Sequence, residues 1–290
     1  MSIGTSVAAE IGLPDGFKGQ AIRPGDAEYD AARTVYNRMI DRRPALIIRP
    51  TGAADIRDAV AFARQQRLPL AVRGGGHSVA GVSMVEAGVQ IDLSSLKGVH
   101  IDPERGTAIC NAGALWGEYD REAEMFGLAT PGGRVTTTGV SGFCLGGGYG
   151  WLSTKYGLTC DNMVGADLLT ASGEMLHVTD DTNPELMWAL RGAGANFGVV
   201  TSFEFRLHPM QRQVIGGKLT FPIERMRDLG TPLPAAAFWL GLAIQFGGCD
   251  GKLTNCLPIV AGWNYMVRLY RPHQEILNGT WKFPAAVPVN

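Results

Sequence analysis

Three consecutive glycines followed by a histidine give this 290-residue chain its clearest chemical signal, in the stretch Arg73-Gly74-Gly75-Gly76-His77-Ser78. The stretch follows the apolar run Leu68–Val72, which is typical of a short buried strand that ends in a glycine-rich turn. Glycines have no side chains to keep a ligand away, and their backbone N–H groups can converge on an anion. We therefore expect a dinucleotide pyrophosphate at this turn, with His77 placed to touch the reactive ring of the cofactor.

A second glycine-rich stretch covers residues 135–150 and contains six glycines and four Ser or Thr hydroxyls. Each interior glycine costs a helix or a strand about 0.5–1 kcal/mol relative to alanine, so we expect neither element here. Close contact with a large flat or charged ligand would offset that cost. The two glycine-rich stretches are therefore predicted to approach the same ligand.

The segments around the first glycines have the pattern of a β-α-β unit. Strands are expected at 45–48, 68–72 and 89–93, with a helix at 53–66, which implies parallel strands and a right-handed crossover. Before them we expect a mobile leader over about residues 1–25 and a short helix at 29–39.

The residues after the glycines argue against a Rossmann site for NAD. Such a site needs a helix that begins at once and the spacing G-x-G-x-x-G, whereas Ser78–Ser83 is small, β-branched and interrupted by Gly81. Asp92 stands about where an acid that binds the ribose would stand. The favoured interpretation of Asp92 is nevertheless a structural aspartate at the end of a strand.

From Gly98 onward the pattern changes to short alternating segments, which predicts a second and more antiparallel subdomain. Strands are expected at 99–102, 107–111, 163–170, 176–179 and 201–207, and helices at 115–125 and 184–190. His208-Pro209 is expected to mark the end of this subdomain.

Composition and charge limit the possible partners. With 46% hydrophobic residues, the chain can bury a full core and is expected to form more than one domain. Its net charge of −1 leaves no basic surplus for a nucleic acid, so a small-molecule ligand is expected instead. The five cysteines form no C-x-x-C pair and are expected to be reduced thiols: Cys110, Cys144, Cys160, Cys249 and Cys256.

The sequence also indicates a location. The first fifteen residues lack the apolar region of a signal peptide, and the longest apolar stretch, 235–246, is shorter than the ~20 residues of a membrane span. We therefore expect a cytoplasmic protein with no membrane partner. Nothing in the sequence specifies an oligomeric state.

Together these segments resemble the FAD-binding domain of the berberine-bridge-enzyme-like oxidoreductases, within the vanillyl-alcohol-oxidase or PCMH superfamily. The resemblance runs from Arg42 to Pro209 and rests on RPALIIRPTG, AVRGGGHS, GLATPGG, TTGVSGFCLGGGYGWLSTKYGL, the dipeptide DN and NPELMWALRGAGANFGVVTSFEF. It implies an α+β chain with a PCMH-type FAD-binding fold of two α/β subdomains, at about 42–105 and 106–209. A leader and helix over 1–41 would precede this fold, and an incomplete antiparallel-sheet substrate domain over 210–290 would follow it.

The resemblance also implies which residues bind FAD. Arg73, Gly74, Gly75, Gly76, His77 and Ser78 would hold the pyrophosphate, and His77 matches the histidine that the family bonds covalently to the 8α-methyl carbon of the flavin. The other matching positions lie in the later glycine-containing segments: Gly81, Gly132, Gly133, Val135, Thr138, Gly139, Gly142, Gly148, Gly198, Val199 and Val200.

Some family members form a second covalent bond to the flavin through a cysteine, at the position that Val135 occupies here. Cys144 is therefore expected to be a small buried hydrophobic residue, the usual fate of a free cysteine. Covalent attachment of FAD is accordingly predicted through His77 alone.

The activity that the resemblance implies is hydride transfer to FAD from a small organic substrate, such as a sugar, an alcohol, an amine or a secondary metabolite. Dioxygen would then reoxidise the flavin. The family pattern fades after Leu229 and the chain ends at Asn290, without most of the expected substrate domain. No catalytic base is therefore named, and the alternative is a non-catalytic FAD-binding fragment or a degenerate paralogue.

Overall fold

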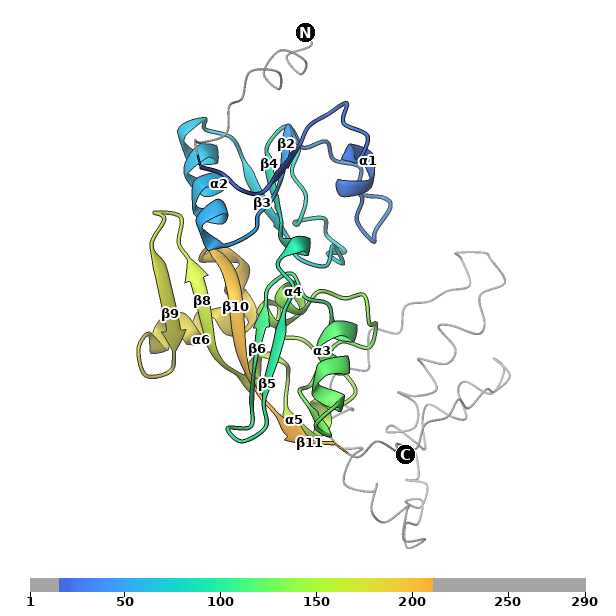
Figure 1. Ribbon diagram of the computed structural model, residues 1–290, viewed down its shortest axis with the longest axis vertical. Helices are drawn as coiled ribbons and strands as arrows, with labels where there is room; N and C mark the ends of the chain where they lie inside the picture. Colours follow the sequence, from blue (N-terminus) through green and yellow to red (C-terminus); the bar gives the residue numbers. More distant parts are fainter. Residues whose placement is uncertain (1–15, 211–290) are drawn as a thin grey trace, which may run out of the picture. The chain divides into compact units, whose positions relative to one another are not determined.

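The computed structural model of this chain describes residues 16–210, and within that range residues 16–152 and 156–210 belong to one compact unit. Its strands form two main sheets and one short pair (Figure 1). The α+β class predicted from the sequence is confirmed. The predicted substrate domain over 210–290 lies outside the described residues, apart from Met210.

The first sheet has the strand order β1-β2-β4-β3. β4 (Val89–Asp92) lies between β2 (Leu46–Arg49) and β3 (Leu70–Arg73) and is parallel to both, while β1 (Gln20–Ile22) runs antiparallel to β2. All four residues of β4 are buried, as expected for a central parallel strand that is covered on both faces.

The helix α2 (Ala53–Gln65) connects β2 to β3 and packs against β4 (Figure 1). Its apolar side chains recur at helical spacing, and the buried ones enter the same core cluster as β2 and β4: Ile56, Ala59, Val60, Phe62 and Ala63. The predicted β-α-β unit is therefore present. Its two strands are separated in the sheet by β4, which comes later in the chain.

The segment before β2 differs from the prediction in two ways. β1 pairs with β2 inside the predicted leader, and α1 covers only Tyr29–Ala32 instead of 29–39. The helix ends early because the β-branched Thr34 and Val35 favour it little and because the backbone N–H of Tyr36 donates to the Gly76 carbonyl instead, at 2.9 Å. The segment 34–38 therefore lies against the glycine turn.

The second sheet is antiparallel throughout, with the order β5-β6-β10-β8-β9. Its strands are β5 (Val99–Asp102), β6 (Thr107–Asn111), β10 (Val199–Arg206), β8 (Met163–Leu169) and β9 (Met175–Thr179). Because β5 and β6 pair with each other here, the change of sheet falls between Asp92 and Val99. The predicted subdomain division at 105/106 lies between the two strands of this hairpin.

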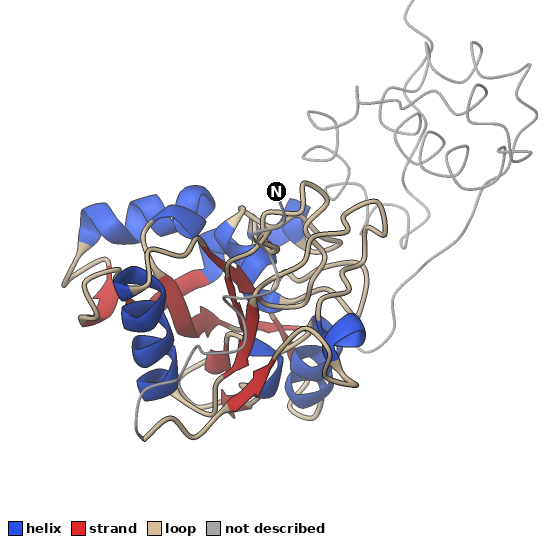
Figure 2. Cartoon of the chain, turned by 90° about the horizontal axis from the view of Figure 1, so that it is seen from above, coloured by secondary structure: helices blue, strands red, loops and turns tan. Residues whose placement is uncertain are grey.

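Helices pack against the second sheet, and in the view from above helices flank the central strands (Figure 2). α3 (Trp116–Glu124) packs against β5, and α6 (Pro184–Ala193) packs against β9. An aromatic cluster lies between α3 and β10, in which Trp116 forms T-shaped ring contacts with Tyr119 and Phe143 and a tilted one with Phe205. The remaining elements are short: β7 (Leu128–Ala129), which pairs with β11 (His208–Pro209), α5 (Ser153–Tyr156), and 3-10 turns at Leu93–Ser95, Cys160–Asn162 and Gly194–Asn196.

One helix contradicts the prediction for residues 135–150. α4 (Val140–Leu145) lies inside that stretch and has Gly142 in its interior. Val140 and Cys144 are fully buried, and α4 packs against α6. Burial of this face against its neighbours therefore offsets the low helix propensity of the glycine.

In the described range, no helix has the length and apolar character that crossing a membrane would require.

Candidate functional site

The turn Gly74–Ser78 follows directly after β3 and opens no helix, as its sequence predicted. Gly76 has a φ of +69°, in the left-handed region that favours glycine. Within the part of the chain that the structure describes, none of the backbone N–H groups of Gly74–Ser78 donates a hydrogen bond to another residue. These donors are therefore available to an anionic ligand.

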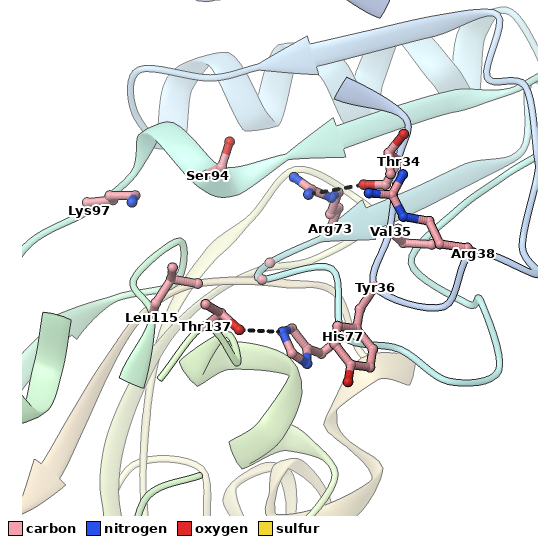
Figure 3. Close-up of a pocket in the computed structure, with 12 residues that line it drawn as sticks. Thr34, Val35, Tyr36, Arg38, Arg73, His77, Ser94, Lys97, Leu115 and Thr137 are labelled. Atoms are coloured by element: carbon pink, nitrogen blue, oxygen red, sulfur yellow. Dashed lines mark hydrogen bonds between the residues drawn. The ribbon is translucent and has the colours of Figure 1, made fainter. Parts of the chain in front are cut away.

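A pocket of about 330 Å³ opens beside this turn (Figure 3). Its wall combines the segment 34–38, the glycine turn, the residues that follow β4, and two residues from the second subdomain. The lining residues are Thr34, Val35, Tyr36, Arg38, Arg73, Gly74, Gly75, His77, Ser94, Lys97, Leu115 and Thr137.

His77 contacts two other side chains that line this pocket, Thr137 and Tyr36. Its Nε2 lies 3.0 Å from the Thr137 hydroxyl, and its ring stacks on the ring of Tyr36 with centroids 4.4 Å apart and planes at 15° (Figure 3). Partial burial lowers the pKa of His77, because the low-dielectric surroundings disfavour the charged imidazolium. The ring is therefore neutral near pH 7 and has a nitrogen lone pair for nucleophilic attack.

Arg73 lines the pocket but is held by an ion pair. Its Nη1 donates to the fully buried carboxylate of Asp92 at 2.9 Å, and Arg49 donates to the other oxygen of that carboxylate at 3.0 Å. The Asp92 carboxylate also caps the next turn by accepting from the Ser94 N–H at 3.2 Å. Asp92 thus has the structural role that the sequence favoured, and it fixes Arg73 at the edge of the sheet.

The second glycine-rich segment meets the first through bare backbone. A Cβ on Gly75 would overlap the backbone nitrogen of Gly139, and a Cβ on Gly139 would overlap that of Gly75. A Cβ on Gly74 would likewise overlap the Ser141 hydroxyl. These glycines are therefore required for contact between two parts of the protein, whatever ligand lies beside them.

Most of the other predicted glycines also have a packing reason. Cβ atoms on Gly132 and Gly133 would lie 2.5 Å and 2.9 Å from atoms of the Trp116 ring, and a Cβ on Gly148 would lie 2.5 Å from the Thr159 hydroxyl. A Cβ on Gly81 would likewise come too close to the Ile40 side chain, and a Cβ on Gly198 would overlap the Leu169 carbonyl oxygen. Among the predicted cofactor-binding glycines, Gly142 alone would direct a Cβ into open space.

The structure brings four of the predicted residues to the pocket, namely Arg73, Gly74, Gly75 and His77. The other predicted residues do not line it, and Val199 and Val200 are buried in β10. Contacts of these residues with a cofactor stay predictions.

Two cysteine-related predictions can be followed in the structure. Val135 is 50% exposed. The position at which the resemblance would place a flavin-linked cysteine is therefore accessible, but here it has an aliphatic side chain. Cys144 is fully buried beside the Met163 sulfur at 3.9 Å, and burial raises its pKa well above the usual range. The prediction of Cys144 as a buried hydrophobic residue is confirmed.

Sequence reasoning missed the two residues that contact His77. The sequence predicts Thr138 of the run Thr136–Thr138 as the cofactor contact, but Thr137 provides the hydroxyl beside the imidazole, while the backbone of Thr138 bonds Val135 and Trp116. Tyr36 was assigned to a helix that ends before it. The motif identified the threonine run, and only the fold shows which hydroxyl faces the histidine.

The pocket fits a dinucleotide cofactor by its own chemistry. Its wall includes Gly74 and Gly75, whose backbone N–H groups donate to no other described residue, and the exposed cationic side chain of Arg38. The Arg73 Nε–H is buried without a hydrogen-bond partner among the described residues, so one further donor at this wall is left unsatisfied. No group of three or more His, Cys, Asp or Glu in residues 16–210 is arranged to hold a metal ion.

Comparison with known proteins agrees with this chemistry. Residues 44–179 match the family model described as FAD binding domain. The chain is 37% identical to (R)-6-hydroxynicotine oxidase from Paenarthrobacter nicotinovorans over 215 residues, which cover 74% of this chain and 47% of that protein. The chain thus spans about half the length of the curated relatives that it matches.

Solved structures show the same fold. The crystal structure of 6-hydroxy-D-nicotine oxidase from Arthrobacter nicotinovorans matches with a TM-score of 0.75 and 36% identity, over 78% of this chain and 51% of that one. Glucooligosaccharide oxidase from Acremonium strictum, described with a 6-S-cysteinyl, 8α-N1-histidyl FAD, matches with a TM-score of 0.62 and 30% identity, over 65% and 40% of the two chains.

The matched FAD domain, the shared fold and the glycine turn with its histidine agree with the resemblance seen in the sequence. This chain belongs to the FAD-linked oxidoreductases of the vanillyl-alcohol-oxidase, or PCMH, family, together with berberine-bridge-enzyme-like proteins.

Proposed function

We propose that this chain is the FAD-binding part of an oxidase-type oxidoreductase, with FAD bonded covalently to His77 only and dioxygen as the final electron acceptor. The observation that carries the proposal is the position of His77, which is half-buried in the pocket and adjacent to the glycine turn. When bound, FAD supplies the acceptor for a hydride from a small organic substrate.

Different residues of the chain would bind different parts of the cofactor. The unbonded N–H groups of Gly74–Ser78 would bind pyrophosphate oxygens, and Arg38 would add positive charge to that side of the pocket. Asp92 keeps the Arg73 guanidinium in place, so that the end of β3 is rigid where the turn begins. His77 remains neutral and provides the nucleophilic nitrogen for attachment.

Val135 and the buried Cys144 support attachment through the histidine alone. The side chain of Val135 has no nucleophile, and a thiol as buried as that of Cys144 is kept in its unreactive protonated form. The relatives named above include an oxidase of a hydroxynicotine and an oxidase of an oligosaccharide, which supports a small organic substrate.

Denaturation in acid tests the covalent bond. The purified chain is expected to keep its yellow flavin in the acid pellet, whereas the His77→Ala variant is expected to release it to the supernatant. His100→Ala, which changes an exposed histidine on β5, is the matched control and should keep the flavin. Flavin that washes out of the unaltered chain, or that stays in His77→Ala, would contradict the proposed link.

A second candidate is a non-catalytic FAD-binding module, because the chain spans only about half the length of its relatives. This alternative predicts bound FAD whose absorption band is not bleached by sugars, alcohols or amines in the absence of oxygen. Bleaching by any one of these substrates would establish oxidation and exclude the alternative.

A further inference from the structure

The hydrogen bond between His77 and Thr137 joins the two glycine-rich segments across 60 residues of sequence. It is the only polar contact of the imidazole within the described range, and it engages Nε2 while Nδ1 has no partner there. On the proposed function, in which His77 carries the flavin, we infer that Thr137 is a positioning residue that holds the Nε2–H tautomer and leaves Nδ1 as the attacking atom.

The geometry limits the orientation of the ring on two sides. The Tyr36 ring lies against one face of the imidazole, and its backbone is fixed by the hydrogen bond from the Tyr36 N–H to the Gly76 carbonyl. The Thr137 hydroxyl lies at one edge, at 3.0 Å from Nε2 (Figure 3). A ring flip would break that bond, so the same two contacts that hold the ring also decide which nitrogen faces away from Thr137.

The Thr137 hydroxyl could accept from Nε2–H or donate to Nε2, and only the first arrangement leaves the Nδ1 lone pair free for attack. A neutral imidazole has one N–H and one lone pair, and the hydrogen bond made by one nitrogen sets the state of the other. With the proton on Nε2, the donor meets a hydroxyl oxygen that has two lone pairs, and the nucleophilic lone pair is on Nδ1. Partial burial of the ring supports this state by lowering the pKa of His77 and keeping the imidazole neutral.

The attachment step balances with this arrangement. A bond forms between Nδ1 and the 8α-methyl carbon; one proton leaves that carbon, and a second proton leaves Nε2. The two electrons released are held in the flavin ring until dioxygen accepts them, with the two protons, as hydrogen peroxide. Nε2 then has a lone pair instead of a proton, and the Thr137 hydroxyl can reverse its role and donate to it.

The side chain of Thr137 is exposed, so it can be changed without opening a cavity in the core. Thr137→Val removes the hydroxyl at nearly constant shape, and Thr137→Ser restores it. Thr136→Val is the matched control, because that neighbouring side chain is also exposed but does not line the pocket.

The first measurement uses the 290-residue chain prepared without flavin. The ¹⁵N chemical shifts of its histidine rings are expected to show His77 with the proton on Nε2, and this preference is expected to weaken in Thr137→Val. If the wild-type ring has its proton on Nδ1, the inference is overturned, and this result does not depend on whether the chain binds flavin.

The second measurement adds FAD and follows the fraction of flavin that survives acid denaturation. Loss of one hydrogen bond of ordinary strength predicts attachment about tenfold slower in Thr137→Val, with near wild-type rates in Thr137→Ser and Thr136→Val. The flavin-bearing peptide of the wild type is expected to be linked through Nδ1.

The outcomes separate this inference from the function on which it rests. If the wild-type chain never bonds FAD, the covalent assignment of His77 fails and the inference fails with it. If the wild type bonds FAD but Thr137→Val does so equally fast, or if the link is at Nε2, only the role of Thr137 is overturned.

Discussion

The two glycine-rich segments of this chain are packed against each other at Gly75 and Gly139, yet they differ in what the rest of their backbone offers to a ligand. In the turn Gly74–Ser78 the backbone N–H groups have no partner in the described part of the chain and lie beside the pocket. In the segment 132–150 most glycines are packed against protein atoms, such as the Trp116 ring and the Thr159 side chain. Both segments therefore use glycine for packing, and the turn alone also leaves backbone donors for a ligand.

A cluster of glycines in a sequence can have two different structural causes. A missing Cβ can leave room for a ligand, or it can allow two backbones to touch, and the sequence is the same in both cases. In this fold the second use prevails: Gly139 has no space for a methyl group because Gly75 occupies it. Substitution with alanine separates the two uses, since only packing glycines are needed by the protein without its cofactor.

The largest effect is expected from Gly139→Ala. The added Cβ would overlap the Gly75 backbone, which cannot rotate away as a flexible side chain would. We expect a loss of about 3–5 kcal/mol in the free energy of unfolding, measured by urea denaturation of the flavin-free chain. Gly52→Ala, whose Cβ would meet nothing within 4 Å, is the control and should cost no more than about 1 kcal/mol, the price of a weaker N-cap on α2. Equal stability of Gly139→Ala and wild type would show that the two segments do not touch in this way.

The next effect concerns the support behind the glycine turn. Asp92→Asn removes the negative charge that Arg49 and Arg73 share, and both guanidinium groups lose a charge-assisted hydrogen bond. Because the two arginines are partly exposed, we expect a cost of about 2–3 kcal/mol rather than the larger loss of a wholly buried pair. The same measurement on Asp58→Asn, which alters a surface ion pair with Arg57, should give less than about 1 kcal/mol. Similar losses of unfolding free energy in both variants would show that Asp92 contributes no more to stability than a surface ion pair does.

The sequence predicted the parts of this structure that depend on local pattern. Alternating Phe203 and Phe205 marked β10, and Ile56 and Val60 marked α2, because burial of one face leaves a period in the sequence. Failure of the glycine turn to open a helix was also visible, since Ser78–Ser83 contains β-branched residues and a glycine.

The sequence could not show what depends on contacts between distant segments. α4 forms because Val140 and Cys144 are buried against other elements, which outweighs the propensity of Gly142. The neighbours of His77 come from positions 41 residues before it and 60 residues after it, at Tyr36 and Thr137. Neither is marked by spacing, so the motif located the histidine but not the groups that orient it.

The third prediction concerns the chemistry of the exposed turn and its dependence on pH. Desolvation lowers the pKa of His77, so the ring stays neutral at pH values where an ordinary histidine, with a pKa near 6.5, already gains a proton. The rate of covalent flavin attachment should therefore be constant down to about pH 6.5 and fall tenfold per pH unit only below the lowered pKa. The folded chain also loses stability over this acidic range, because the unfolded chain binds the proton at the higher pH.

Tyr36→Ala sharpens this prediction. Removal of the stacked ring exposes the imidazole to water, so its pKa should return toward the ordinary value and the decline in attachment rate should begin at a higher pH. Attachment rates measured from pH 5 to pH 8 compare the two chains. A wild-type rate that already declines above pH 6.5 would show that His77 is not desolvated in the way the fold indicates.

The smallest effect, and the most direct test of the two uses of glycine, is expected from Gly142→Ala. Gly142 lies inside α4, and a Cβ there would meet no protein atom within 4 Å. Alanine in a helix interior is favoured over glycine by about 1 kcal/mol, so the flavin-free chain should become slightly more stable. If the cofactor approaches α4 as the sequence predicted, the same methyl group should weaken FAD binding, measured by fluorescence titration of the flavin-free chain. A variant that is more stable and binds FAD as tightly as the wild type would show that the cofactor does not approach this glycine, and the ligand-facing use of glycine would then be confined to the turn that carries His77.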